Sequence, residues 1–135
     1  METFPLRLPP GADLKAALDA LVIEKGWSAA VVLTGIGSLD LATIRFADRD
    51  VATPISGPLE ILSLGGTLSA GGSHLHIAVS DGDGRVVGGH LKEGATVRTT
   101  AEIVMGILPG WEFCREMDPA TGYLELSVNR SRPAD

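Results

Sequence analysis

Hydrophobic and polar residues follow strand-like spacing over most of this chain, and one segment stands out because its spacing is helical. From Asp13 to about Lys25 the apolar residues recur every three or four positions, as in a helix with one buried face. Asp13 is a favourable N-cap, and Gly26 is a favourable stop at the other end. The sequence therefore predicts one main helix near the N-terminus.

The other apolar stretches favour strands, because they are short, rich in β-branched residues and separated by glycine, proline and aspartate. Residues 96–108 suit either a helix or a strand, and we assign the larger part to a strand. Pro5 suggests that the first strand lies at a sheet edge. Expected strands are 3–8, 28–34, 39–47, 51–55, 59–64, 96–108 and a last hairpin of 111–117 with 123–129, with turns at 35–38, 48–50 and 56–58.

This order of elements predicts an α+β fold with a mostly antiparallel β-sheet. The 135 residues suit a single domain, 1–135, that is long enough to bury a core, and residues 130–135 are expected to fray.

All three histidines lie between Leu68 and Leu91, where a tight turn at residues 81–84 predicts a hairpin. His74 and His76 are two residues apart, so on a strand they point to the same face. If Ser80 pairs with Arg85, His90 falls on the opposite face. A β-bulge at residues 88–89, a loop one residue longer, or a contact with a neighbouring subunit would each bring it into reach.

Three imidazoles on one face predict a site for a divalent transition metal, with zinc as the first choice. Three histidines that leave a fourth position open are typical of catalytic zinc, where a bound water can be activated for hydrolysis. The simpler interpretation is that His74, His76 and His90 are polar residues on a solvent-facing strand. Because they are all the histidines of the chain and span only seventeen positions, the metal interpretation is favoured.

Glu60 and Glu102 are the next candidates. Either carboxylate could orient an imidazole by accepting its free N–H or could shuttle a proton, and either could equally be a surface group paired with an arginine. Asp81 and Asp83 resemble the start of a calcium loop, but no downstream glutamate completes an EF-hand, so a hairpin turn is favoured. Cys114 has no histidine near it in sequence and is interpreted as a buried or idle thiol and not as a nucleophile.

Charge and cysteine content narrow the classes of function. The formal net charge is −6 and the pI is about 4.9, which argues against binding to nucleic acid or an anionic membrane. The single cysteine excludes an internal disulfide, and the first residues lack the apolar core of a signal peptide. A reduced, cytoplasmic setting is therefore expected.

Several motifs, taken together and in this order, resemble the PPC (plants and prokaryotes conserved) domain family. No single piece is specific, but the series spans nearly the whole chain. The motifs are Gly35-Ile36-Gly37-Ser38-Leu39, Glu60-Ile61-Leu62-Ser63-Leu64-Gly65-Gly66-Thr67, His74-Leu75-His76, Asp83-Gly84, Gly88-Gly89-His90-Leu91 and Thr100-Ala101-Glu102.

The resemblance implies a β-rich α+β fold, assembly as a homotrimer and a metal site at His74, His76 and His90. In plant relatives the domain follows a DNA-binding AT-hook and binds partner proteins through a Gly-Arg-Phe-Glu-Ile-Leu motif. This chain has no AT-hook, and the corresponding residues 57–62 read Gly-Pro-Leu-Glu-Ile-Leu. The loss of the arginine and the phenylalanine argues against partner binding through that motif.

Two classes of function remain. In the first, a metal-binding trimer acts on or senses a small molecule. In the second, a regulatory or scaffold module binds a protein partner or DNA, as in plant relatives. The acidic composition favours the first class, because affinity for DNA depends on cations that neutralise phosphates.

We expect that the isolated protein does not bind duplex DNA specifically near physiological salt. Its 11 lysines and arginines are scattered among 17 acidic residues. An anisotropy titration against mixed-sequence duplexes measures this directly. Saturable binding tighter than about 10⁻⁶ M, beyond typical non-specific affinity, would favour the regulatory class instead.

Overall fold

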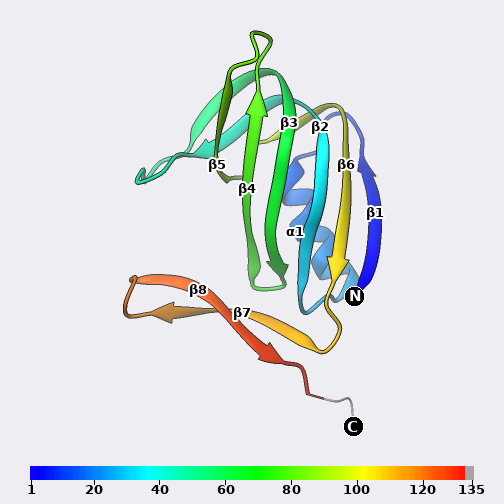
Figure 1. Ribbon diagram of the computed structural model, residues 1–135, viewed down its shortest axis with the longest axis vertical. Helices are drawn as coiled ribbons and strands as arrows, with labels where there is room; N and C mark the ends of the chain where they lie inside the picture. The colour runs from blue at the N-terminus through cyan, green and yellow to red at the C-terminus, as the bar shows by residue number, and fades with distance from the viewer. Residues whose placement is uncertain (133–135) are drawn as a thin grey trace.

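The structure, a computed structural model, describes residues 1–132 and is a mostly antiparallel β-sheet with one helix, as predicted (Figure 1). Within these residues no helix is long and apolar enough to cross a membrane. The elements in chain order are β1 (Glu2–Leu8), α1 (Leu14–Lys25), β2 (Ala30–Arg45), β3 (Thr53–Ser69), β4 (Gly72–Ser80), β5 (Val86–Leu91), β6 (Thr96–Ile107), β7 (Trp111–Asp118) and β8 (Tyr123–Arg130).

The predicted helix is confirmed together with both of its caps. The Asp13 carboxylate accepts a hydrogen bond from the backbone N–H of Ala16 at 3.0 Å, and Gly26 takes the left-handed conformation with φ of 65°. The second oxygen of Asp13 accepts from the N–H of Gly94 at 2.6 Å, so the start of the helix is also tied to the loop before β6.

Six strands form one antiparallel sheet in the order β1-β6-β2-β3-β4-β5, with β1 at an edge as Pro5 suggested. The last residues of β2 also pair with β5, through Ile44 with Leu91 and Arg45 with His90. The strands β2, β3, β4 and β5 therefore close on themselves at one end. This closure brings residues of β2 beside the strand that carries His90.

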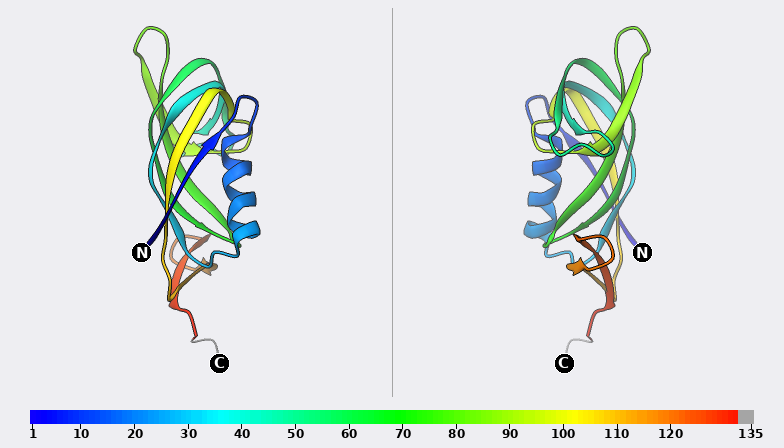
Figure 2. Two further views of the ribbon diagram at one scale, coloured as in Figure 1. Left: turned by 90° about the vertical axis from the view of Figure 1, so that its right-hand side faces the viewer. Right: turned by 90° about the vertical axis from the view of Figure 1, so that its left-hand side faces the viewer.

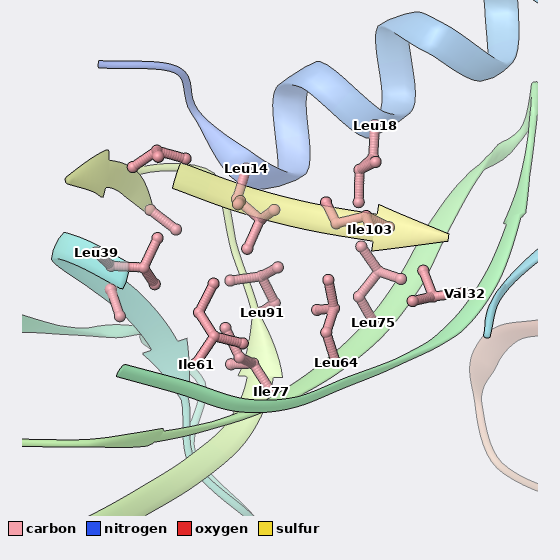
Figure 3. Close-up of a cluster of buried hydrophobic side chains, with 14 of the residues drawn as sticks. Leu14, Leu18, Val32, Leu39, Ile61, Leu64, Leu75, Ile77, Leu91 and Ile103 are labelled. Atoms are coloured by element: carbon pink, nitrogen blue, oxygen red, sulfur yellow. The ribbon is translucent and has the colours of Figure 1, made fainter. Parts of the chain in front are cut away.

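The core lies between α1 and the concave face of this sheet (Figure 2). Leu14 and Leu18 of the helix are fully buried and point into the same cluster as Leu75, Leu91 and Ile103 of the strands (Figure 3). Burying each such side chain contributes about 1.5–3 kcal/mol. The other face of the sheet, called the outer face below, carries no helix.

Two predicted turns are wrong, because β2 and β3 are long continuous strands. Residues 35–38 lie inside β2, where the pairing with β6 shifts register between Gly37 and Leu39. A Cβ at Gly37 would overlap the carbonyl oxygen of Thr100 on the neighbouring strand. Glycine serves here to allow close approach of two strands at a bulge, and the chain does not turn.

Residues 56–58 are the second incorrect turn. They lie inside β3, which begins at Thr53 and not at residue 51 as expected. The pairing with β2 shifts register between Leu39 and Leu41, opposite this segment. The glycine and proline mark an irregularity in the strand pair, and the strand runs through it.

The remaining strand predictions are confirmed. Residues 96–107 form β6, and the last hairpin is β7 with β8, which lies below the end of the six-stranded sheet in Figure 1. Arg130 ends β8 and residues 133–135 lie outside the described residues, so the expected fraying of residues 130–135 stays a prediction.

Gly66 on β3 is required for the pairing with β4, and this can be tested. Its φ is 144°, and an added Cβ would overlap the carbonyl oxygen of His74. We predict that Gly66→Ala lowers the free energy of unfolding by about 2 kcal/mol or more, from strain and the displaced strand. Urea denaturation measures the change.

Gly65→Ala is the matched control for that substitution. Gly65 has no atom within 4 Å of an added Cβ and no positive φ. The free energy of unfolding of this variant should stay the same or rise slightly, because alanine restricts the unfolded chain. Equal losses in the two variants would contradict the assigned close approach.

Candidate metal centre

Strand alternation on β4 places two histidines on the outer face of the sheet. Leu75 is fully buried under α1, so His74 and His76 on either side of it point away from the core. His76 is exposed, and His74 is partly buried. The predicted same-face pair is therefore present in the fold.

The loop between β4 and β5 decides where His90 lies. Ser80 pairs with Val86, and the pairing then continues without a register shift to His76 opposite His90. Of the three routes considered from the sequence, a loop one residue longer is the one used, and the bulge at residues 88–89 is not formed. The carboxylate of Asp81 holds this loop by accepting from the N–H groups of Asp83 and Arg85, each at 2.9 Å.

The three imidazoles form a compact cluster on the outer face. The Nε2 atoms of His74 and His76 are 3.1 Å apart, and the rings of His74 and His90 stack with centroids 4.6 Å apart. One nitrogen from each ring can be chosen so that all three lie within 4.8 Å of one another. No other group of three potential metal ligands occurs within residues 1–132.

This spacing fits a small divalent metal. Two nitrogens at about 2.0–2.1 Å from a tetrahedral zinc ion are roughly 3.3 Å apart, close to the separation of the His74 and His76 nitrogens. Rotation of the side chains can bring the third nitrogen to a similar spacing. Three imidazoles fill three of four positions, so the fourth ligand must come from outside the cluster.

The protonation state of the cluster also suits a metal. Burial, and after it the nearby positive groups His74, Lys92 and Arg45, lower the pKa of His90 to about 4. Burial also lowers the pKa of His74, with His76 and Arg115 as further causes, although Glu125 opposes the shift. At neutral pH both rings are therefore neutral, which is the form that binds metals.

Charged residues from distant segments surround the histidines. Arg45 of β2 approaches His90, with Nη2 3.5 Å from Nδ1, and Arg115 of β7 donates to Thr67 at 3.2 Å beside the strand of His74. Two adjoining hollows of about 530 and 940 Å³ open here, and both are lined by His74, Arg115 and Glu125. The hairpin β7–β8 therefore forms one wall of the site.

Sequence reasoning missed the roles of Arg45, Arg115 and Glu125. No local motif marks them, because their positions depend on the closure of β2 onto β5 and on how the last hairpin lies. The alternating pattern of β7 and β8 could predict a hairpin but not its location.

The two glutamates expected to support the histidines lie elsewhere in the chain. Glu60 pairs with Ser80, four residues along β4 from His76, which is about 13 Å at strand spacing. Glu102 lies on β6, three strands from β4 and so about 14 Å away. Within one chain neither carboxylate is placed to orient a histidine. Cys114 is partly buried on β7 opposite Ser127.

This chain is similar in sequence and structure to several known proteins. It is 46% identical over 130 residues to the bifunctional protein GlmU of Synechococcus sp. (strain JA-3-3Ab), a match that covers 96% of this chain and 21% of that protein. The chain thus spans about a fifth of the length of the curated relatives it matches.

Three solved structures share the fold. A hypothetical protein from Salmonella is 40% identical with a TM-score of 0.94, covering 96% of this chain and 94% of the other. A metal-containing protein from Archaeoglobus fulgidus is 32% identical with a TM-score of 0.79, covering 94% of each chain. A candidate DNA-binding protein from Bacteroides thetaiotaomicron is 25% identical with a TM-score of 0.83, covering 93% and 91%.

The sequence profile of the Plants and Prokaryotes Conserved domain, abbreviated PCC or PPC, matches residues 1–109. The matched region contains α1, the six-stranded sheet and all three histidines. It ends just before the hairpin that walls the site. The chain belongs to the Plants and Prokaryotes Conserved domain family.

Proposed function

We propose that this chain binds one divalent transition metal, with zinc as the first choice, through His74, His76 and His90, and uses it to bind or act on a small molecule. The observation that carries the proposal is the convergence of all three histidines on one outer face, with the ligand nitrogens within 4.8 Å of one another. The structural relative from Archaeoglobus that is described as metal-containing supports it. A cytoplasmic setting, in which Cys114 stays reduced, is part of the proposal.

The residues around His74, His76 and His90, together called the triad below, support a small-molecule role. When bound, such a metal supplies Lewis acidity toward an oxygen of a ligand. The three histidines supply three of the four ligands of a tetrahedral metal, so the fourth position is left to another donor. The adjoining cleft of about 940 Å³ is large enough to admit a small molecule that supplies this donor. Arg45 and Arg115 line this cleft and can orient what enters it.

A second candidate function is a regulatory or scaffold module. The relative from Bacteroides favours it, because that protein is a candidate DNA-binding protein. Four cationic residues also line the larger cleft, but Asp48, Asp50 and Glu125 line the same cleft. A phosphate backbone would meet these carboxylates as well, so we place the small-molecule role first.

We further propose that the domain assembles as a homotrimer, as the family resemblance implies. One face of the β7–β8 hairpin is largely apolar, because Met117 pairs with Leu124 and Phe113 with Val128. Met117, Leu124 and Val128 are each more than half exposed. A two-stranded hairpin is marginally stable in water by itself, so this face is expected to pack against another surface.

The outer face of the sheet offers such a surface on a second copy. Leu33, Ile36 and Leu62 are exposed there at 45%, 53% and 52%. A hairpin that packs on the outer face of the next copy is a head-to-tail contact, and contacts of this kind close into a trimeric ring when successive copies are related by a third of a full turn. Three copies would then cover these side chains, and because Met117 and Leu124 also line the larger cleft, the next copy would border that cleft.

The metal proposal predicts about one divalent transition metal per chain in protein purified without a histidine tag. His76→Ala should lose most of the metal, because two imidazoles bind far more weakly than three. The variant should still fold, because His76 is exposed and contributes little to the core. Elemental analysis of both proteins measures this.

Ser80→Ala is the matched control, since Ser80 lies on the same strand and the same face as His76. This variant should keep the metal content of the wild type. Equal metal content in His76→Ala and the wild type would contradict the site, as would its loss in Ser80→Ala.

The trimer proposal predicts a mass near 42 kDa in sedimentation equilibrium at micromolar concentration, three times the chain mass of 14.0 kDa. Leu124→Glu should shift the protein toward the monomer, because it places a charge on the apolar hairpin face. Ile23→Glu, on the exposed side of α1, should leave the mass unchanged. A monomeric wild type would overturn the proposal.

A further inference from the structure

The positive groups around the triad form an arrangement that neither the sequence motifs nor the metal site itself explains. The larger cleft is lined by four cationic side chains, those of Arg45, Arg49, Lys92 and Arg115. The ion pairs within residues 1–132 are Lys15–Asp19, Arg85–Asp83 and Arg98–Asp40, so none of the four lies within 4.0 Å of a carboxylate. Asp48, Asp50 and Glu125 line the same cleft, but they form no ion pair with the four cations, which outnumber them by four to three. Within residues 1–132 the cleft therefore offers free cationic groups to an incoming anion.

Arg45 is the most informative of these residues. Its Nη1 donates to the carbonyl oxygen of Arg49 at 3.1 Å, and its Nη2 faces Nδ1 of His90 at 3.5 Å. A guanidinium is only a donor, so the second contact is a hydrogen bond only when Nδ1 of His90 carries no proton. The contact thus depends on the tautomer of a metal-ligand candidate.

Metal binding removes that acceptor in either of the two possible ways. If Nδ1 is the ligand atom, its lone pair is taken. If Nε2 is the ligand atom, the neutral ring carries its proton on Nδ1, which then donates. In both cases Arg45 keeps a free N–H beside the triad, and in the second case the N–H of His90 faces Arg45, so that two donors meet without an acceptor between them.

Histidine ligands usually donate their second N–H to a carboxylate, a carbonyl or water. Among the described residues, 1–132, the side-chain contact of His90 is with Arg45, and no carboxylate accepts a hydrogen bond from its ring. The carboxylate of Glu125 accepts a hydrogen bond from the hydroxyl of Thr121 at 3.1 Å. An external oxyanion would satisfy Arg45 and His90 together.

We infer that the cleft between β5 and the β7–β8 hairpin binds a small oxyanion, a carboxylate or phosphate group, held by Arg45 and Arg115 beside the three histidines. Arg45 approaches from β2 and Arg115 from β7, so the two guanidinium groups reach the cleft from different elements. Arginine suits this role because its planar fork matches the oxygens of both groups. The inference deepens the proposed function and rests on it for the metal. The positions of the two arginines do not depend on a bound metal.

The test uses the full chain loaded with cobalt(II), whose visible absorption reports on the ligand environment, and isothermal titration calorimetry on the same samples. The probes are inorganic phosphate, acetate, and acetamide as the uncharged counterpart of acetate. Phosphate or acetate should bind and change the spectrum, and acetamide should bind at least tenfold more weakly. The stronger of the two anions identifies the group that the cleft prefers.

Arg45→Gln and Arg115→Gln should each weaken anion binding at least tenfold, because each removes a charge-assisted hydrogen bond to the anion. Both variants should retain cobalt, which shows that they fold. Arg98→Gln is the matched control, since Arg98 is exposed on β6 and paired with Asp40. Its affinity for the anion should equal that of the wild type.

The outcomes separate the two levels of the proposal. If cobalt is bound but neither anion binds, or if Arg98→Gln weakens binding as much as Arg45→Gln, the anion site is overturned and the metal proposal stands. If no metal is retained, the metal proposal is overturned, and calorimetry on the metal-free protein then decides the anion site. Anion binding that Arg45→Gln weakens tenfold would uphold it, and its absence would overturn it.

Discussion

The burial of one leucine fixes the position of the candidate site. Leu75 packs under α1 with no exposed surface, and a strand can direct it inward only by directing its two neighbours outward. His74 and His76 are therefore held on the outer face by the core and not by contacts of their own. A change that weakens the packing of Leu75 would therefore act on the two candidate metal ligands without touching them.

The parts of the site that follow from local rules could be predicted from the sequence, and the others could not. Alternation alone places His74 and His76 together, and turn-forming residues predict the hairpin that returns His90. The register of that hairpin depends on a loop of five residues rather than four, which the sequence leaves open because Asp-Gly pairs suit several turns. Glu60 and Glu102 could not be placed, since their distance from the histidines depends on strand order.

The helix and most strands could also be predicted, whereas the continuity of β2 and β3 could not. Glycines at 35 and 37 and the Gly57–Pro58 pair look like turns in a linear pattern. In the fold, Gly37 allows β2 to approach β6, and the 57–58 segment lies opposite a register shift. Whether a glycine bends a chain or lets a neighbour come close is a property of the sheet, so a one-dimensional pattern cannot distinguish the two.

The exposed loop from Asp81 to Arg85 has a consequence for how this family can vary. Surface loops generally tolerate insertions and deletions, because they carry few contacts. Here one added or lost residue would exchange His90 and Leu91 between the two faces of β5, unless a bulge compensated. Two added residues would restore the face but move His90 two positions away from its partner. The number of residues in the loop therefore sets the register of β5 against β4. Relatives that keep the three histidines should vary far more in the sequence of this loop than in its length.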